Sequence, residues 1–229
     1  MNVVTHDMVA SDPEVRDNID QANRSLGVIG YTEHGERHLG IVSKRAKELL
    51  TKLGKDERTA ELSAIASRLH DIGNVVNRRY HGMFGAVLAK PILMRLGMPF
   101  NEIHQVINAI GNHNEGECDI VSDISAALIL ADKSDVHFTR VRITGDVEGD
   151  IHDRVNFAAK SSDFYVRPAS QEESKEHSAI IGIEILIDPN VSTVMEYFQI
   201  FLARMDVCKR AAEFLGCKFE LIINGVKLA

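Results

Sequence analysis

The first two-thirds of the chain place apolar residues at a spacing of three and four, which predicts successive amphipathic helices. One helix is expected to begin at Asp12 and Pro13, a capping residue followed by a first-turn proline, and to end near residue 25. The next begins near Glu36 and ends at Gly54. A third runs over about 56–70. This part therefore has the pattern of a helical bundle.

The same spacing continues beyond residue 80. Apolar residues over 83–96 include Pro91, so we expect a kink or two short helices there. Asn101 is predicted to cap a further helix, and Asp123 to open the last one. These elements together predict an all-helical domain over residues 1–145.

After residue 145 the apolar period changes from helical spacing to alternation. Isoleucines alternate with other residues over 181–187, which predicts a half-buried strand. A long amphipathic helix follows over about 192–215, then a strand over 218–223, and a weaker strand is possible over 164–167. The fold class is thus mainly α, with a small C-terminal α+β unit of two or three strands and one long helix at 146–229. An unpaired strand edge predicts that this unit mediates homo-oligomer formation, most simply a dimer.

Composition narrows the class of protein. The 33 acidic and 26 basic residues give a net charge of −7, which disfavours an extended nucleic-acid surface. No apolar stretch approaches the roughly 20 residues of a membrane-spanning helix, and the N-terminal segment lacks the pattern of a secretion signal. Three cysteines without metal-ligand spacing predict neither a disulfide framework nor a zinc finger. We therefore expect a soluble cytoplasmic protein, whose unusual feature is ten histidines with no tryptophan.

Three His-Asp dipeptides occur, at 6–7, 70–71 and 152–153. Only the second ends an apolar helix, where an unpaired imidazole and carboxylate would be costly to bury. The first and third have polar neighbours, and we expect them to be solvated or to cap helices.

Other helices place similar side chains on their apolar faces. His38 precedes Val42 by four residues, His113 continues the stripe of its helix, and Asp132 lies on the stripe of the last helix. His104 is rotated away. Each of these alone is more often a hydrogen-bonded core residue. Together they favour a metal site, because one ion would satisfy all of them.

Four residues occur in an order that is typical of one family's metal ligands: His38, His70, Asp71 and Asp132. The pattern resembles that of the HD phosphohydrolase superfamily, an all-helical fold of metal-dependent phosphomonoesterases and phosphodiesterases. RYHGMFGAVLA and AIGNHNEG are similar to segments of binuclear members, which places His81 and His113 as further ligands. The resemblance covers about 32–142. NHNEGECD lacks the paired histidines and GYP motif of cyclic-dinucleotide phosphodiesterases, so that subfamily is disfavoured.

The resemblance implies one or two metal ions per chain. His38, His70 and Asp132 would hold one ion, His81 and His113 a second, and Asp71 would bridge both as the catalytic carboxylate that orients the attacking hydroxide. Histidine and carboxylate ligands suit Mn, Fe, Co, Ni or Zn better than Mg.

Several basic residues are candidates for contacting a substrate phosphate: Arg45, Arg78, Arg79, Lys133 and His34. Each arginine is more often a surface or salt-bridging residue than a phosphate contact. Lys133 could instead hold a carboxylate such as Asp135, and His34 could simply begin a helix.

These observations predict a metal-dependent phosphohydrolase that hydrolyses a phosphomonoester or phosphodiester of a small metabolite, with a nucleotide favoured. A non-catalytic regulatory module that binds metal or nucleotide is the alternative, and a closed structural metal site is a third class. Metal content together with hydrolysis of generic nitrophenyl esters would separate the three.

Overall fold

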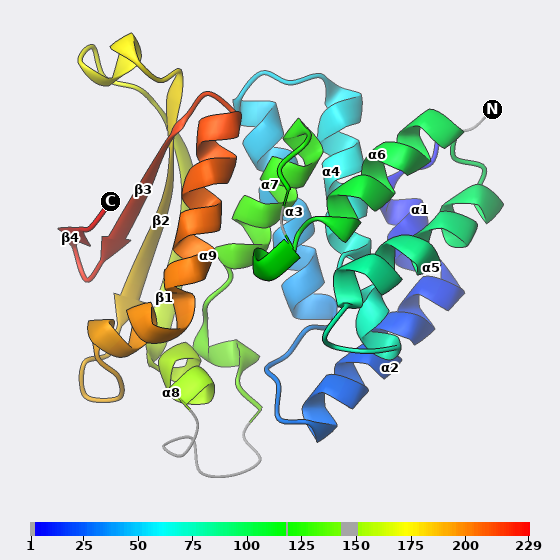
Figure 1. Cartoon of the computed structure of the whole chain (residues 1–229), viewed down its shortest axis with the longest axis horizontal. Helices are drawn as coiled ribbons and strands as arrows, with labels where there is room; N and C mark the ends of the chain where they lie inside the picture. Colours follow the sequence, from blue (N-terminus) through cyan, green and yellow to red (C-terminus); the bar gives the residue numbers. More distant parts are fainter. Residues whose placement is uncertain (1–2, 118, 143–150) are drawn as a thin grey trace. The chain divides into compact units, whose positions relative to one another are not determined.

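The computed structural model describes residues 3–117, 119–142 and 151–229 (Figure 1). The chain divides into two compact units, Met1–Asp132 and Lys133–Ala229. The boundary predicted near residue 145 lies outside the described residues. No helix in the described part of the chain is long and apolar enough to cross a bilayer.

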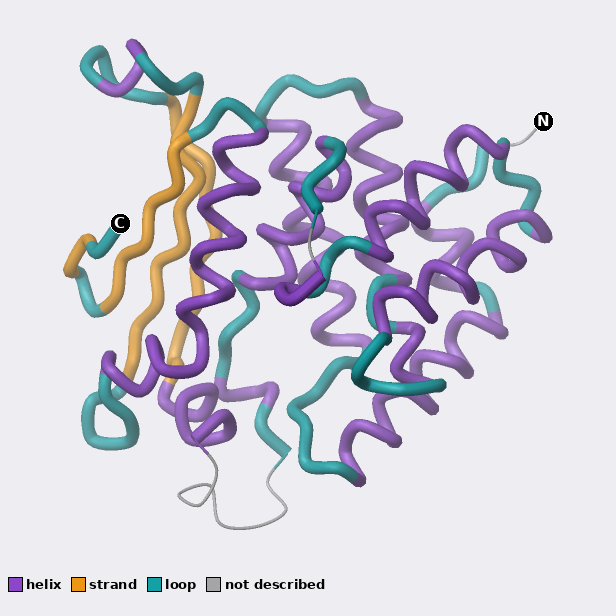
Figure 2. Tube along the Cα trace, in the orientation of Figure 1, coloured by secondary structure: helices purple, strands orange, loops and turns teal. Residues whose placement is uncertain are grey.

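The first unit is helical, as predicted, and Figure 2 shows its helices in purple. Its elements are α1 (His6–Ser11), α2 (Pro13–Val28), α3 (Glu36–Lys52), α4 (Glu57–Leu69), η1 (Ile72–Val75), α5 (His81–Arg95), α6 (Phe100–Gly111), η2 (Glu115–Glu117) and α7 (Asp123–Lys133). Asp12 caps α2 by accepting from two backbone N–H groups, and Asp56 caps α4, so both predicted starts are confirmed. Helix α1 was not predicted.

Packing of these helices brings several of their ends to one place. α3 packs on α4, α5 packs on α6, and the η1 turn packs against both α2 and α5. The side chains of Leu39, Val42, Leu50, Ile65 and Leu69 are buried between the helices. Polar side chains lie where the start of α3, the end of α4 and the start of α5 come together. Apolar residues fill the layers between the helices.

Pro91 lies inside one continuous helix, α5, so the alternative of two short helices is wrong, and a kink at this residue stays a prediction. Pro91 is on the exposed side of α5, where the carbonyl that loses its donor can bond to solvent. The cap of α6 is Pro99 instead of Asn101, because the Pro99 carbonyl already accepts from the Ile103 N–H at 3.0 Å.

The second unit contains a four-stranded sheet, one strand more than expected, within the described residues. Its elements are η3 (Phe138–Arg140), α8 (Ile151–Ala158), β1 (Ala159–Pro168), η4 (Glu173–Lys175), β2 (Ala179–Ile187), α9 (Val194–Phe214), β3 (Lys218–Ile223) and β4 (Val226–Lys227). β1 pairs antiparallel with β2, and β2 pairs parallel with β3 through the α9 crossover. Asn224 and Gly225, both at positive φ, form the tight turn into β4. Self-association through this unit stays a prediction.

Candidate metal centre

Six side chains from five segments of the first unit converge in its interior. They are His38 in the first turn of α3, His70 and Asp71 directly after α4, His81 at the start of α5, His113 just beyond α6, and Asp132 near the end of α7. All four histidines are at least 97% buried. The structure therefore brings together the six residues predicted as ligands, and places His104 on the surface as expected.

The first group is built around the Oδ2 atom of Asp71 and the Oδ1 atom of Asp132. His70 Nε2 lies 3.2 Å from Asp71 Oδ2 and 3.6 Å from Asp132 Oδ1. His38 Nε2 lies 3.8 Å and 3.3 Å from the same two oxygens. Two carboxylates and two imidazoles thus surround one point.

The second group uses the other oxygen of the same aspartate. His81 Nε2 lies 3.5 Å from Asp71 Oδ1 and 3.0 Å from His113 Nε2. The carboxylate of Asp71 therefore faces one pair of histidines with each oxygen, which is the arrangement of a bridging ligand between two ions.

Backbone carbonyls decide which nitrogen of each ring can act as a ligand. His70 Nδ1 lies 2.7 Å from the Ser67 carbonyl, His81 Nδ1 2.9 Å from the Arg78 carbonyl, and His113 Nδ1 2.7 Å from the Ile110 carbonyl. A carbonyl only accepts, so each Nδ1 carries a proton and each neutral ring presents a lone pair at Nε2. This is how proteins orient metal-binding histidines.

These lone pairs face each other and the carboxylates, an arrangement that requires a cation. Nε2 of His70 is buried and makes no well-directed hydrogen bond with any described group. A divalent metal ion fits this donor set, because it would accept the imidazole lone pairs and neutralise the carboxylates together.

The pKa values of His70, Asp71 and His81 also reflect the need for a positive charge next to the carboxylates. Burial lowers the pKa of His70, but the carboxylates of Asp71 and Asp132 outweigh it and raise that pKa to about 10. Burial opposes ionisation of Asp71, yet His70, His34 and His81 hold its pKa well below the usual range. Burial lowers the pKa of His81. The centre thus favours ionised carboxylates next to a positive charge.

Glycines allow the short connection between Asp71 and His81. A Cβ at Gly73 would collide with the backbone carbonyl of His81 and the backbone amide of Gly85. Gly85 in turn leaves room for η1, since a Cβ there would lie 3.2 Å from the His70 carbonyl. The η1 turn therefore packs directly on the first turn of α5, which carries His81 to the far side of Asp71.

Asn74 is a functional candidate that sequence reasoning missed. Its Nδ2 atom donates to the Asp71 carbonyl at 2.9 Å and to Asp71 Oδ1 at 2.8 Å. Its Oδ1 atom accepts from Arg78 at 3.3 Å. The sequence does contain one indication of this role: the amide of Asn74 follows Asp71 by three residues, which is the spacing of one helical turn. Asn74 fixes the orientation of the carboxylate that serves both groups.

Replacing Asn74 with alanine should weaken metal binding about 10- to 100-fold, because Asp71 loses the donor that orients it. Titration of the metal-stripped protein with Mn²⁺ measures the effect. Asn77→Ala is the matched control, since Asn77 is exposed and caps only the Arg79 N–H. Equal affinity in the two variants would contradict the assigned role.

Of the two arginines in the loop before His81, one lies at the centre. Arg78 is half-buried, 3.9 Å from Asp71 Oδ1, with its guanidinium 5.0 Å from the centre of the Tyr31 ring. Arg79 is exposed, and its guanidinium lies over the Tyr80 ring instead.

The remaining phosphate candidates lie in different settings. His34 is buried, with its ring centre 5.6 Å from that of His38. Arg45 is partly exposed on α3, two turns beyond His38. Lys133 is buried at the end of α7 and belongs to the second unit. There, Asp135 lies 3.7 Å from the Nε atom of Arg140. A contact of Lys133 with Asp135 or with substrate stays a prediction.

The sequence of the helical unit matches the model of the HD domain over residues 35–136. Residues 35–136 form an HD domain. All six clustered side chains fall within this range, and the predicted family and mainly helical fold class are confirmed. HD domains define a superfamily of metal-dependent hydrolases.

Two further comparisons are more distant. The uncharacterized protein MJ1020 of Methanocaldococcus jannaschii is 27% identical over 140 residues, which cover 52% of this chain and 54% of that protein. The HD-domain chain thus spans about half the length of this relative. A solved structure of a predicted HD superfamily hydrolase from an uncultured Thermotogales bacterium has 21% identity and a TM-score of 0.41, over 57% of this chain and 73% of that one.

Proposed function

We propose that this HD-domain protein is a metal-dependent phosphohydrolase that cleaves a phosphoester bond of a small metabolite. The observation that carries the proposal is the division of the Asp71 carboxylate between two histidine pairs, 3.2 Å and 3.5 Å from its two oxygens. A bridging carboxylate of this kind serves a pair of divalent ions.

The residues that would hold the metal fall into two sets. His38, His70, Asp71 and Asp132 would hold one ion, and Asp71, His81 and His113 a second. Mn, Fe, Co, Ni and Zn suit these ligands. When bound, such ions supply Lewis acidity toward phosphoryl oxygens and lower the pKa of water.

The chain's own residues would position the substrate. Arg78 presents N–H donors next to the carboxylate cluster, and the Tyr31 ring and Asn74 hold its guanidinium in place. A guanidinium matches two oxygens of a phosphate and would draw the ester toward Asp71. The four histidines and Asp71 are themselves buried, so their interactions with a substrate would be weakly screened by solvent.

We favour a nucleotide as substrate. Tyr31 lies beside Arg78 with 42% of its surface exposed, so it offers an aromatic ring next to the phosphate-binding guanidinium. A base could stack on such a ring, whereas a sugar phosphate would gain less from it. Comparing nucleoside monophosphates with sugar phosphates as substrates tests this preference.

Hydrolysis of p-nitrophenyl phosphate and bis(p-nitrophenyl) phosphate tests the reaction. We expect Mn²⁺-dependent release of nitrophenol that EDTA abolishes, and a fall of about tenfold or more in kcat/KM for Arg78→Ala, because a charge-assisted contact to phosphate is lost. Arg79→Ala is the matched control and should change the rate little. Metal binding without any hydrolysis would instead support the regulatory-module alternative.

The number of metals is a separate prediction. Elemental analysis should find about two ions per wild-type chain and about one in the His81→Ala, His113→Ala double variant, because the first set of ligands stays intact. A single ion in the wild type that persists in the double variant would show that these histidines are not ligands.

A further inference from the structure

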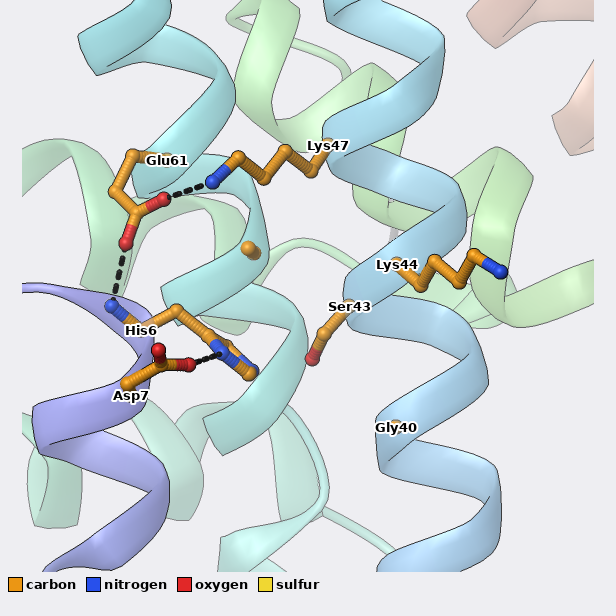
Figure 3. A pocket seen from close by; sticks show the side chains of 8 residues that line it. His6, Asp7, Gly40, Ser43, Lys44, Lys47 and Glu61 are labelled. Atoms are coloured by element: carbon orange, nitrogen blue, oxygen red, sulfur yellow. Dashed lines mark hydrogen bonds and ion pairs between the residues drawn. The ribbon is translucent and has the colours of Figure 1, made fainter.

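A second pocket lies in the helical unit, between α1, α3 and α4, and shares no residue with the metal centre (Figure 3). It encloses about 230 Å³. Its polar lining comes from three helices: His6 and Asp7 on α1, Ser43, Lys44 and Lys47 on α3, and Glu61 on α4. The sequence pattern had suggested that His6 is solvated or capping, but the structure places its ring at this pocket.

Two buried polar atoms meet in the pocket without a partner among the described residues. The Ser43 hydroxyl, on a residue only 2% exposed, makes no hydrogen bond, and neither does His6 Nε2. In Figure 3 the Ser43 hydroxyl points from α3 toward the His6 ring. Buried polar atoms of proteins are nearly always hydrogen-bonded, so this pair points to a ligand that contacts both.

The neighbouring charges define what that ligand can be. Both carboxylate oxygens of Glu61 already accept a hydrogen bond, one from Lys47 at 2.6 Å and the other from the His6 backbone N–H at 2.6 Å. Lys47 keeps further N–H donors on its ammonium group. His6 Nδ1 lies 3.2 Å from Asp7 Oδ1, and in the tautomer that carries its proton on Nδ1 the Nε2 atom is an acceptor. The pocket therefore offers two donors and one acceptor.

The order Asp7, His6, Ser43 is reminiscent of a nucleophilic triad, but the surroundings favour binding over catalysis. Ser43 lies in the middle of α3, where backbone N–H groups are used within the helix and cannot stabilise an oxyanion. The Asp7 side chain is 98% exposed, so it does not hold His6 in a protected environment.

Gly40 opens the wall of the pocket on α3. No atom lies within 4 Å of the position that a Cβ would take there. The residue is exposed and lies one turn before Ser43, so bare backbone borders the opening of the pocket next to this serine.

We propose that this pocket binds a small hydroxylated anion. The acidic group, a phosphate or a carboxylate, accepts from Ser43 and Lys47, and a hydroxyl group of the ligand donates to His6 Nε2. The volume is below that of pockets for drug-sized ligands, which limits the ligand to a metabolite of a few carbons.

Isothermal titration calorimetry of the full-length, metal-loaded protein tests this site with three probes: glycerol 3-phosphate, glycerate and glycerol. We expect saturable binding of at least one of the two anions and none of glycerol, and the two anion arms distinguish phosphate from carboxylate. Ser43→Ala should weaken the binding about tenfold by removing one donor. Ser63→Ala is the matched control, because this buried serine of α4 bonds the Ala60 carbonyl and does not line the pocket.

A second pair of variants separates the pocket from the metal centre. Gly40→Leu should abolish binding by filling the opening, whereas Gly40→Ala should retain most of it. Binding should also persist in Asp71→Ala, which disrupts only the metal centre. No saturable binding of either anion would overturn the proposal, as would binding that survives Ser43→Ala and Gly40→Leu but is lost in Asp71→Ala.

Discussion

Asp71→Ala should remove most bound metal and lower phosphoesterase activity by about a thousandfold. Both oxygens of this carboxylate face imidazole nitrogens, at 3.2 Å and 3.5 Å, and among the described residues it is the carboxylate that is grouped both with His38 and His70 and with His81 and His113. Loss of the carboxylate would remove one of the two negative groups that lie next to His38 and His70 in the cluster, leaving Asp132. Elemental analysis and the rate of nitrophenol release measure the two effects.

Two controls accompany this variant. Asp71→Asn keeps the volume of the side chain and removes its charge, so an equal loss of metal would assign the effect to charge instead of to misfolding. His104→Ala removes an exposed histidine of α6 and should leave metal content unchanged. Normal metal stoichiometry in Asp71→Ala would contradict the assigned centre.

Gly73→Ala should destabilise the helical unit by about 3 kcal/mol and reduce metal binding. The added Cβ would meet the backbone of His81 and Gly85, and backbone cannot move aside as the end of a flexible side chain can. Relief requires α5 to shift away from η1, which carries His81 away from Asp71. Urea unfolding of the metal-free protein measures the first effect, and titration with Mn²⁺ the second.

Gly40→Ala provides the comparison for this effect. A Cβ at Gly40 meets no atom within 4 Å, and alanine is the better helix former by about 1 kcal/mol. This variant should therefore be at least as stable as the wild type. If Gly73→Ala and Gly40→Ala had the same midpoint of urea unfolding, the close approach of η1 to α5 would not contribute to stability.

The helices and the residues of the centre could be predicted from sequence because both follow from periodicity. Asp12 and Asp56 mark helix starts by their capping chemistry, and His38 and Asp132 fall on apolar stripes where a polar side chain must meet a partner. The 3.3 Å distance between His38 Nε2 and Asp132 Oδ1 confirms that inference about position. Metal binding by these residues stays a prediction.

Other features depend on tertiary contacts that no local pattern contains. Helix α1 is six residues long, and the partner of its first N–H is Glu61, 55 positions away. Gly73 and Asn74 lie in the buried η1 turn, and their roles depend on the distances from η1 to Asp71 and to α5. The continuity of α5 through Pro91 could not be predicted because the sequence does not show that this side of the helix faces solvent.

Anomalous diffraction from crystals of the Mn²⁺-loaded protein tests the central claim most directly. We predict two anomalous peaks within ligand distance of Asp71, one also near His38, His70 and Asp132, and the other near His81 and His113. A crystal with these six side chains ordered and no anomalous peak among them would contradict a metal centre at this place.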